Sequence, residues 1–356
     1  MKIPKILVDG HVLDGRPQGT TTYIAGLYKA IAENNLAKVT IASFNKESLE
    51  KYNLTHPNIK WVKLPRKNKY FRLLFSLPYL EYRIRPDFSH YNYVGPIIKF
   101  SKRIITCHDL LFLDFPEYFS RTYRVKNKIL FYISALNADI ISTVSKYSAN
   151  AISKHFLIPF NEIMIAPNAI NTEECSHDDQ NFKYKNYFVY VSRFEPRKNQ
   201  HSLIQAFNQF CDKHNEEFKL ILVGYNDLPY TSLEKELVKS KNNRIKILSD
   251  LKKTDLIKLY KNSIASIYPS NAEGFGIPPI EAIAAGGVSY CSNNTALSEI
   301  SDYVNGTFDS NNVDEIEQTL HKAIDMANSD TQYNLRNKVL ENFNWKKTAE
   351  IFMSYL

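Results

Sequence analysis

Apolar runs of strand length alternate with amphipathic stretches along almost the whole chain. The pattern begins with an apolar run at residues 5–10 and continues at 19–33, where Ile24, Leu27 and Ile31 recur at the spacing of one helix face. Strands that are separated by helices pair in parallel, so this alternation predicts βαβ units. Further strands of this series are expected at 38–44, 86–90, 102–110, 138–145 and 162–170, and further helices at 121–138 and 145–156.

A second series of the same kind follows the polar stretch 171–186, which is the best linker candidate. Two consecutive series in 356 residues predict the α/β class, with two Rossmann-like, doubly wound parallel-sheet domains facing a cleft. We expect these domains to comprise residues 1–170 and 171–343. Strands of the second series are expected at 187–194, 218–226, 244–251, 265–270 and 288–292, and helices at 200–214, 253–263, 278–286, 312–328 and 345–356.

Basic residues are concentrated in the first half of the chain. Residues 1–170 hold 24 Lys and Arg against 12 Asp and Glu, a net +12, whereas the rest hold 21 against 25, a net −4. The densest stretch, 66–85, has six cations and one acid, Glu81, among aromatic and aliphatic side chains. This mixture suits an anionic membrane surface, and a buried helix with charged ends is the alternative. No nucleic-acid partner is expected, because no binding-motif spacing occurs and the second half is acidic.

The four cysteines, Cys107, Cys175, Cys211 and Cys291, form no CxxC-type pair, which argues against a zinc site or a redox dithiol. The first residues lack the apolar core of a signal peptide, and no segment approaches the ~20 apolar residues of a spanning helix. We therefore expect a cytoplasmic protein, with peripheral attachment to the inner face of the cell membrane as a further option.

Two strand-to-helix corners in the first domain are candidate binding sites, because ligands of doubly wound sheets bind at the carboxyl ends of strands. In residues 14–23, Gly15 and Gly19 bracket a turn whose exposed amides suit a phosphate or a sugar hydroxyl, with a plain structural turn as the alternative. His108 and Asp109 end a later strand, where a histidine could bond a sugar hydroxyl or the transition state. A lone histidine is otherwise more often structural.

Two corners in the second domain concentrate charge. Arg193 and Lys198 lie between a strand and a helix, and two fixed cations suit a pyrophosphate, with solvated surface charges as the alternative. Residues 271–287 contain Glu273 and Glu281, two acids that could accept protons from a hexose and a ribose diol. The glycines between these acids free the backbone to approach a ligand closely.

Together these segments resemble the retaining family 4 glycosyltransferases of the GT-B fold. The resemblance spans nearly the whole chain and departs from the family pattern at Ala169, where glycine is usual, and at Thr20 in the glycine turn. It implies that the last helix, 344–356, packs back onto the first domain. The matching segments are the turn with Gly19, HDL at 108–110, residues 144–152, APNAI at 166–170, SRFEPRKN at 192–199, residues 273–287, TALSEI at 295–300 and FNWKKTAEIF at 343–352.

The resemblance implies a nucleotide-sugar donor. Arg193 and Lys198 would hold the diphosphate, Glu281 the ribose hydroxyls, and Glu273 with the amides after it the donor sugar. Cations and a helix N-terminus would stabilise the leaving group, and the chain has no DxD sequence, so neither a metal nor another cofactor is expected. The implied donor-binding residues are Gly19, Arg193, Lys198, Leu248, Leu251, Glu273, Gly274, Phe275, Gly276, Ile277 and Glu281; the implied catalytic residues are His108 and Glu273, and the implied acceptor contacts are Asp109 and Tyr23.

The sugar and the acceptor stay open at this point. The DGRPxG and HDLLF segments are similar to those of mannosyltransferases that use GDP-mannose to build O-antigens and capsules, which makes mannose the first choice. UDP-linked hexoses are the alternative donors. The acceptor is expected to be a polyprenyl-diphosphate-linked or other cell-envelope glycan. A GT-B epimerase, a phosphorylase and a non-catalytic glycan-binding scaffold are competing classes.

Overall fold

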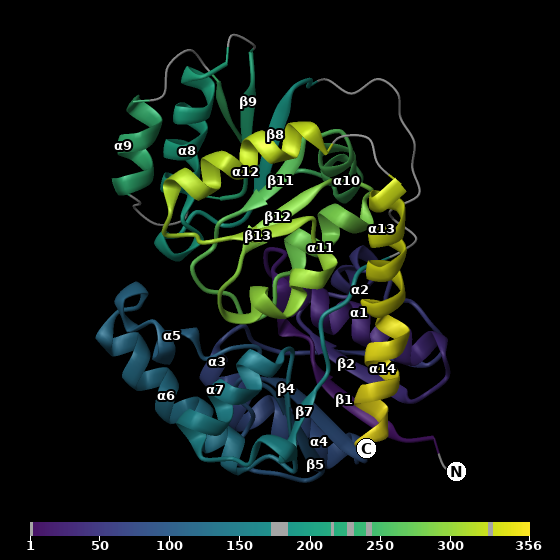
Figure 1. Ribbon diagram of the computed structural model, residues 1–356. Helices are drawn as coiled ribbons and strands as arrows, with labels where there is room; N and C mark the ends of the chain where they lie inside the picture. Colours follow the sequence, from purple (N-terminus) through teal and green to yellow (C-terminus); the bar gives the residue numbers. More distant parts are fainter. Residues whose placement is uncertain (1–2, 172–183, 215–216, 226–230, 240–243, 327–329) are drawn as a thin grey trace. The chain divides into compact units, whose positions relative to one another are not determined.

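The chain folds into two compact units, which are described separately (Figure 1). The first comprises residues 1–169 and 343–356, and the second residues 170–342. Of the predicted linker, residues 172–183, and with them Cys175, lie outside the described part of the chain. The computed structural model describes residues 3–171, 184–214, 217–225, 231–239, 244–326 and 330–356.

The first unit contains a seven-stranded parallel sheet with the strand order β3-β2-β1-β4-β5-β6-β7. Its inner strands are almost completely buried, as expected for a parallel sheet covered on both faces. In register, Ile6 lies opposite Val39 on one side and Phe88 on the other. The strands are β1 (Lys5–Asp9), β2 (Lys38–Ser43), β3 (Ile59–Lys63), β4 (Phe88–Asn92), β5 (Lys102–Thr106), β6 (Ile140–Thr143) and β7 (Ile163–Ile165).

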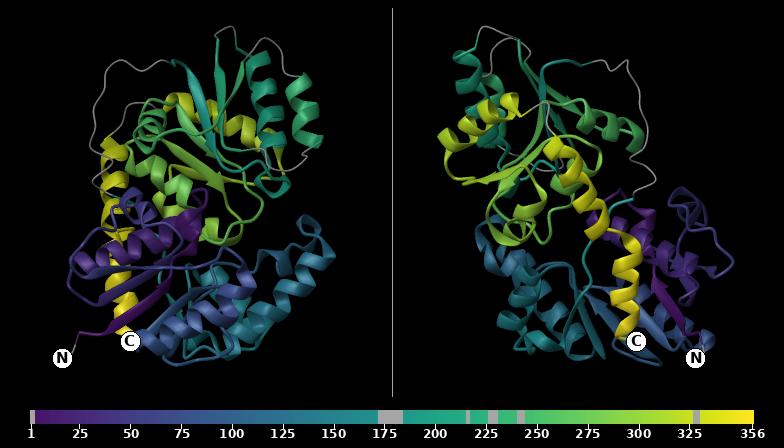
Figure 2. Two further views of the ribbon diagram at one scale, coloured as in Figure 1. Left: turned by 180° about the vertical axis from the view of Figure 1, so that it is seen from behind. Right: turned by 45° about the vertical axis from the view of Figure 1, so that its right-hand side comes forward.

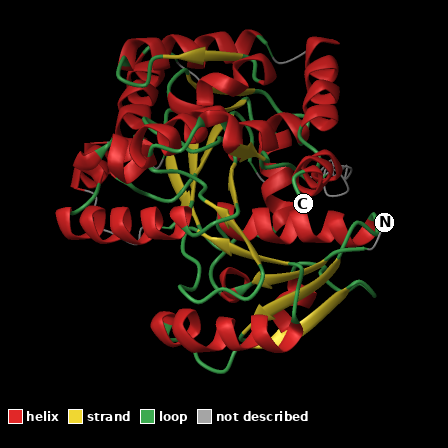
Figure 3. Cartoon of the chain, turned by 90° about the horizontal axis from the view of Figure 1, so that it is seen from below, coloured by secondary structure: helices red, strands yellow, loops and turns green. Residues whose placement is uncertain are grey.

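Helices pack alongside this sheet (Figure 3). The predicted helix at 145–156 is confirmed, and it begins with the expected serine cap: the Ser148 amide donates to Oγ of Ser145 at 3.0 Å. The helical segments are α1 (Gly19–Glu33), α2 (Glu47–Lys51), α3 (Lys69–Phe71), the π-helical η2 (Arg72–Ser76), α4 (Leu77–Ile84), α5 (Leu111–Asp114), α6 (Arg121–Leu136), α7 (Lys146–Phe156) and α14 (Trp345–Ser354).

The last helix, α14, packs on α1 in the first unit (Figures 1 and 2). A Cβ added to Gly26 would lie 2.0 Å from Cε2 of Trp345, so the indole can lie on α1 only because this residue is glycine. The Thr348 hydroxyl donates to the Pro167 carbonyl at 3.0 Å, and Phe352 meets the Tyr28 ring edge-on. Gly26 therefore allows the C-terminal helix to pack on the unit formed by the first half of the chain.

The basic stretch 66–85 corrects one expectation. Arg72, one of its six cations, is buried, and its Nε lies 3.3 Å from Oδ2 of Asp9, at the end of β1. The single acid, Glu81, is fully buried and accepts a hydrogen bond from the Phe100 amide at 2.7 Å. The inner face of the stretch is therefore a charged core contact, as the alternative reading expects, while its other cations are exposed. Attachment of this stretch to a membrane stays a prediction.

The second unit contains a six-stranded parallel sheet with the order β10-β9-β8-β11-β12-β13. Its strands are β8 (Tyr187–Val191), β9 (Lys219–Val223), β10 (Ile245–Leu248), β11 (Ala265–Tyr268), β12 (Ser289–Ser292) and β13 (Gly306–Phe308). Its helices are α8 (Gln200–Asp212), α9 (Thr231–Lys239), α10 (Lys253–Lys261), α11 (Ile277–Ala284), α12 (Val313–Asp325) and α13 (Asp330–Asn342).

All the strands and helices that the sequence predicts are present, with ends shifted by a few residues. The elements that were not predicted are β3, β13, α2, α5, α9 and α13. For residues 66–85, which contain α3, η2 and α4, a helix was expected only as the alternative. The edge strands β3 and β13 are short and only partly buried, so neither carries a strong apolar run. Within the described ranges, no helix is both long and apolar enough to cross a lipid bilayer.

Candidate functional site

The strand order of the second sheet reverses between β8 and β11, which is where ligands bind in doubly wound sheets. β8 ends at Val191 and runs into the segment that carries Arg193 and Lys198. β11 ends at Tyr268 and runs into the segment that carries Glu273. Because parallel strands end at the same edge, the two predicted charged corners lie side by side at the switch point.

Lys198 and Glu273 form a buried ion pair at this edge. Nζ of Lys198 contacts Oε1 of Glu273 and donates to the Tyr268 hydroxyl at 3.2 Å. The same hydroxyl donates to Oε1 of Glu273 at 2.9 Å. Lys198 is 7% exposed and Glu273 8%. Buried charges are strongly unfavourable unless they are paired, so each of these residues depends on the other.

The backbone conformation around Lys198 directs its side chain into the interior of the second unit. It ends the 3₁₀ turn Pro196–Lys198, and Asn199 follows in the left-handed region with φ of 57°. The Asn199 side-chain amide donates to the Ser310 carbonyl at 2.7 Å, and the Tyr190 hydroxyl donates to the Lys198 carbonyl at 2.7 Å. The start of α8 is thereby tied to the neighbouring strands.

The surroundings keep this ion pair charged at neutral pH. Burial by itself would raise the pKa of Glu273, but Lys198 and Arg197 outweigh it and lower the pKa to about 2. Burial and Arg197 lower the pKa of Lys198 to about 8, against the opposing effect of Glu273. Lys198 is therefore protonated at neutral pH, although it gives up its proton more easily than an exposed lysine.

Arg197 is a third cation of the cluster, which the sequence analysis missed. Its Nη1 lies 3.5 Å from Oε2 of Glu273, and its Nε pairs with Glu195 at 2.9 Å. Arg193 pairs with the other oxygen of Glu195 at 2.9 Å, and its side chain is 55% exposed. All three cations stand in one short corner, where the residue pattern does not reveal which of them faces inward.

The glycine segment 274–277 forms a sharp turn into α11. Gly276 has φ of 116°, and a Cβ at this position would lie 2.7 Å from Cδ2 of Leu297. Both facts require glycine there. Phe275 is buried, and Ile277 begins the eight-residue α11, whose prolines lie in the first turn. The predicted close backbone approach therefore lies at a helix N-terminus.

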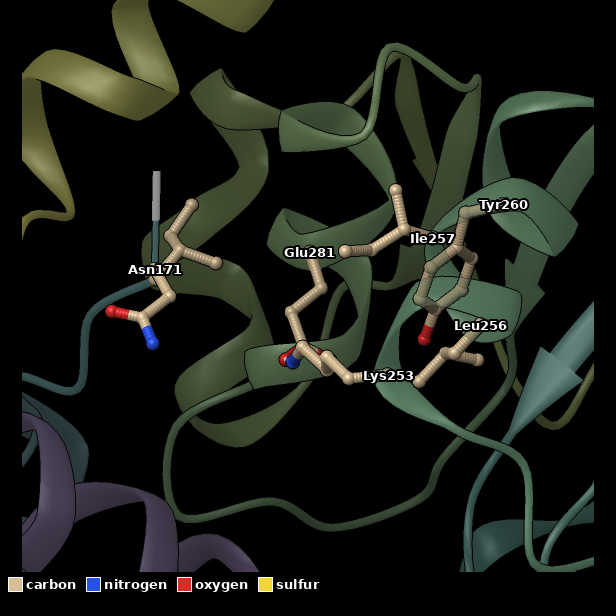
Figure 4. Close-up of a pocket in the computed structure, with 7 residues that line it drawn as sticks. Asn171, Lys253, Leu256, Ile257, Tyr260 and Glu281 are labelled. Carbon is tan, nitrogen blue, oxygen red and sulfur yellow. The ribbon is translucent and has the colours of Figure 1, made fainter. Parts of the chain in front are cut away.

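Glu281 lies on α11 and lines a small, mostly apolar pocket (Figure 4). Its Oε1 accepts a hydrogen bond from Nζ of Lys253 at 2.5 Å. The Tyr260 hydroxyl is buried and has no hydrogen-bond partner among the described residues. Glu281 was predicted from the sequence as a binding residue, whereas Lys253 and Tyr260 were not. The pocket is lined by Ile170, Asn171, Lys253, Leu256, Ile257, Tyr260 and Glu281.

Leu248 and Leu251, the predicted neighbours of a base, lie beside this pocket rather than in its lining. Both are partly buried and pack against the apolar cluster that contains Ile257 and Tyr260. Leu248 is the last residue of β10, so it too lies at the carboxyl edge of the sheet. These leucines share an apolar cluster with two pocket residues.

In the first unit, His108 follows β5 and is buried. Its Nε2 lies 2.9 Å from the Asn92 side-chain oxygen, at the end of β4. Burial lowers the pKa of His108 to about 3, so the imidazole is neutral at pH 7. Because a carbonyl oxygen only accepts, Nε2 is the donor in this contact. Asn92 therefore selects one tautomer of His108, and the sequence analysis missed it.

The remaining predicted residues of the first unit have structural contacts. Tyr23 is fully buried and meets the rings of His108 and Trp345 edge-on, which favours a packing role over the predicted contact with an acceptor. Asp109 is half-buried, and its Oδ1 accepts from the Leu111 amide at 3.3 Å. Gly19 is the first residue of α1, whereas the other predicted donor residues belong to the second unit.

Cys107, Cys211 and Cys291 are buried free thiols. Across the described ranges, no group of three His, Cys, Asp or Glu side chains could hold a metal ion. Metal independence stays a prediction, and chelation tests it.

Two family models match the chain, one after the other. The model described as "Glycosyltransferase Family 4" matches residues 17–174, and that described as "Glycosyl transferases group 1" matches residues 172–341. The chain is 30% identical over 248 residues to O-antigen chain mannosyltransferase B of Escherichia coli, an alignment covering 65% of this chain and 64% of that protein. It is 29% identical over 181 residues to O-antigen chain mannosyltransferase RfbU of Salmonella typhimurium, covering 51% and 49%. The matches thus span less than two thirds of these relatives.

Solved structures share the fold. HepE of Anabaena in complex with UDP-glucose has a TM-score of 0.77 at 18% identity, covering 99% of this chain and 100% of that one. Sucrose-phosphate synthase of Thermosynechococcus elongatus has a TM-score of 0.74 at 18% identity, covering 99% and 98%. The two doubly wound parallel sheets are those of the GT-B glycosyltransferase fold. Within that fold class, the chain belongs to the family 4 glycosyltransferases, with a group 1 domain in its second half.

Proposed function

We propose that this protein is a retaining, metal-independent glycosyltransferase that transfers mannose from GDP-mannose to a cell-envelope glycan or lipid-linked acceptor, such as an O-antigen or capsule precursor. The observation that carries the proposal is the buried Lys198–Glu273 pair, with Arg197 beside it, at the switch point of the second sheet. This position combines cations for a diphosphate with a carboxylate for a sugar.

Lys198 is proposed to bind the diphosphate. An ammonium group has three protons to donate, and two of the described contacts, to Tyr268 and Glu273, use two of them. The third is available for a phosphate oxygen. The charge of a nucleoside diphosphate grows as the glycosidic bond breaks, so a fixed cation stabilises the transition state more than the ground state. Arg193 is proposed to support the diphosphate from its exposed position.

Glu273 and Glu281 are proposed to bind different parts of the donor. Glu273 would accept hydrogen bonds from hydroxyl groups of the sugar, since it stays ionised beside Lys198. Glu281 would accept the ribose hydroxyls, exchanging the hydrogen bond from Lys253 for them. The Tyr260 hydroxyl is an orphan donor in the same pocket, which supports a polar ligand there.

His108 is proposed to accept a hydrogen bond through Nδ1 from a sugar hydroxyl, in the ground state or the transition state, because a neutral imidazole has one N–H and that of Nε2 is donated to Asn92. Its lowered pKa makes a charged imidazolium unfavourable at pH 7. In a retaining reaction of this kind the acceptor attacks on the face from which the nucleotide departs, so no carboxylate nucleophile is needed. The cations of the second unit would supply the charge that a metal ion otherwise brings.

Mannose is proposed because relatives at 30% and 29% identity are named O-antigen mannosyltransferases. A UDP-hexose donor is the second candidate, because a structure that shares the fold is described in complex with UDP-glucose. An epimerase would act on the nucleotide sugar without any acceptor, and a scaffold would bind glycans without releasing a nucleotide.

A lipid-linked acceptor lies at a membrane, and we propose that the protein is peripherally associated through residues 66–85. Arg66, Lys67, Lys69, Arg83 and Arg85 are exposed in this stretch, whereas Arg72 is excluded from the contact by its burial.

The proposal is tested by thermal shift with GDP, UDP and ADP, followed by transfer assays. A ligand that binds the native state raises the melting temperature by mass action. We expect GDP to give the largest shift, GDP-mannose to be consumed only when an acceptor is present, and the product to be the α-anomer by NMR. EDTA should leave the rate unchanged. A larger shift with UDP selects the second candidate, and turnover without an acceptor selects the epimerase.

A further inference from the structure

Helix α6 has two apolar faces. Its inner face, with Phe131 and Ala135, packs in the core cluster of the first unit. On the opposite side, Val125, Ile129, Tyr132, Ile133 and Leu136 form one stripe and are between 38% and 60% exposed. At about 3.6 residues per turn these five positions fall on a single line along the helix. A helix with only one apolar face to bury would carry polar residues along this line.

The segment α3–η2–α4 has the same organisation. Leu73, Leu77 and Leu80 point into the core cluster that α6 also joins. Phe75 and Tyr79, on the outer side, are 61% and 58% exposed. Tyr70, Leu74 and Tyr82 are exposed with them. Two neighbouring helical segments therefore cover the sheet with one face and present large apolar side chains with the other.

The loop 95–100 lies between β4 and β5 in the chain and contacts both helical segments. Buried charged side chains hold this loop in place. Arg103 is 1% exposed and donates to the carbonyls of Pro96 at 2.5 Å and Ile98 at 2.9 Å. The Phe100 amide donates to Glu81. The loop nevertheless exposes Ile97, Ile98 and Phe100. The hydrogen bonds of Arg103 and Glu81 therefore fix the loop in a conformation that exposes its apolar tip.

Side-chain contacts connect the three segments into one surface. Nζ of Lys126, on α6, lies 5.9 Å from the Tyr70 ring centroid. At the other end of α6, the Gly95 amide donates to Oγ of Ser134 at 3.3 Å. The Phe100 and Tyr82 rings meet at 5.6 Å. We call this surface, formed by residues 69–84, 95–100 and 121–136, the outer face.

Charge distinguishes the outer face from an ordinary protein interface. The exposed cations of α6, Arg121, Lys126 and Lys128, flank its apolar stripe, and residues 121–136 contain no acid. Residues 69–84 add the exposed cations Lys69 and Arg83, and their one acid, Glu81, is buried. Three more exposed cations, Arg66, Lys67 and Arg85, lie directly beside them in the chain. Two copies of such a face would repel each other, whereas an anionic lipid surface complements both its charge and its rings.

We propose that the outer face docks the first unit on an anionic lipid bilayer, with the α6 stripe and the 95–100 loop in the interfacial layer and the flanking cations on lipid phosphates. The occupant is the bilayer itself, and α6 is its principal contact. This inference rests on the peripheral association proposed above and deepens it: it adds α6 and the 95–100 loop to the contact with the membrane, and it uses no residue that we assign to the donor or to catalysis.

Vesicle flotation tests the proposal. The wild type should float with vesicles of phosphatidylcholine and phosphatidylglycerol at low salt, less with phosphatidylcholine alone, and progressively less as salt rises. The double variant Val125→Ser/Ile129→Ser should bind at least roughly tenfold more weakly, because it removes apolar area from the interface. Lys126→Ala/Lys128→Ala should bind roughly 25-fold more weakly, at about fivefold for each basic residue.

The matched control is Ile351→Ser/Val238→Ser, which makes the same two changes at exposed positions of α14 and α9. It should float like the wild type. The thermal shift with GDP should be equal in all variants, which separates a failure of docking from a failure of nucleotide binding by the proposed transferase. No flotation of the wild type at low salt would overturn the proposal. So would an equal loss in the control, or a dimer by light scattering that the α6 variant alone dissociates in the absence of lipid.

Discussion

Lys198 and Glu273 form a buried ion pair at the point where β8 and β11 diverge, although they are 75 residues apart in the chain. The Tyr268 hydroxyl bonds to both of them, so three residues from two strand ends form one unit. Removing a single charge from this unit leaves the other buried without its partner.

Lys198→Met should therefore destabilise the protein by up to about 3–5 kcal/mol, because buried Glu273 loses its nearest cation and keeps only Arg197, at 3.5 Å. Lys198→Met/Glu273→Gln should recover most of this loss, since neither residue is then charged. The free energy of unfolding in urea measures both effects. Equal stability of the single and double variants would contradict the coupling.

The same double variant separates stability from function. Although it is folded, its kcat/KM should stay roughly 100-fold or more below the wild type, because a fixed cation near the departing diphosphate is lost. Arg193→Ala should have a smaller effect, since Arg193 is exposed and paired with Glu195. Steady-state transfer assays with folded protein show which of the two variants loses more kcat/KM. Near-wild-type transfer by the double variant would mean that the diphosphate binds elsewhere.

Glu273 should make the protein acid-sensitive. Its pKa is about 2 in the folded state against an ordinary value of 4.5, so the unfolded chain takes up the proton first as the pH falls. The stabilisation, up to about 3 kcal/mol, is fully present above roughly pH 4.5 and is lost as the pH falls toward 2. Chemical unfolding between pH 3 and 6 should show a steeper loss in the wild type than in Lys198→Met/Glu273→Gln. Parallel curves would rule out Glu273 as the source.

Glu281→Ala should weaken GDP binding roughly tenfold, which corresponds to one hydrogen bond to a charged group. The wild type should lose a similar factor with 2′-deoxy-GDP, and the variant should bind both nucleotides equally, because the same contact is already absent. Isothermal titration calorimetry measures all four affinities. A full additional loss with 2′-deoxy-GDP in the variant would contradict a contact of Glu281 with the 2′-hydroxyl.

His108 should not titrate near neutral pH, because burial lowers its pKa to about 3. Asn92→Asp places a carboxylate beside its Nε2, which favours the imidazolium and raises the pKa of His108. The kcat/KM profile of Asn92→Asp should therefore gain an inflection at a pH where the wild type is flat, with the histidine signal followed in parallel by NMR. Asn92→Ala, which cannot supply the charge, should show no such inflection.

Much of the architecture was predictable from local pattern. The apolar run before Arg193 predicts β8, and the amphipathic stretch after Asn199 predicts α8; both are confirmed. Of the site, the sequence identified Lys198, Glu273 and Glu281. It missed Arg197, Lys253, Tyr260 and Asn92, because their roles come from contacts with residues distant in the chain. The short edge strands were missed for want of a strong apolar signal.

Local patterns in the chain are enough to predict the two parallel sheets, their order and the charged strand-to-helix corners, because periodicity and turns are properties of neighbouring residues. Contacts between distant segments, in contrast, bury Lys198 against Glu273 while Arg193 stays exposed, pair Arg72 with Asp9 in the interior, and place Trp345 against Gly26. Local pattern shows that a charge is present, but its burial depends on whether a distant segment supplies the opposite charge or the space.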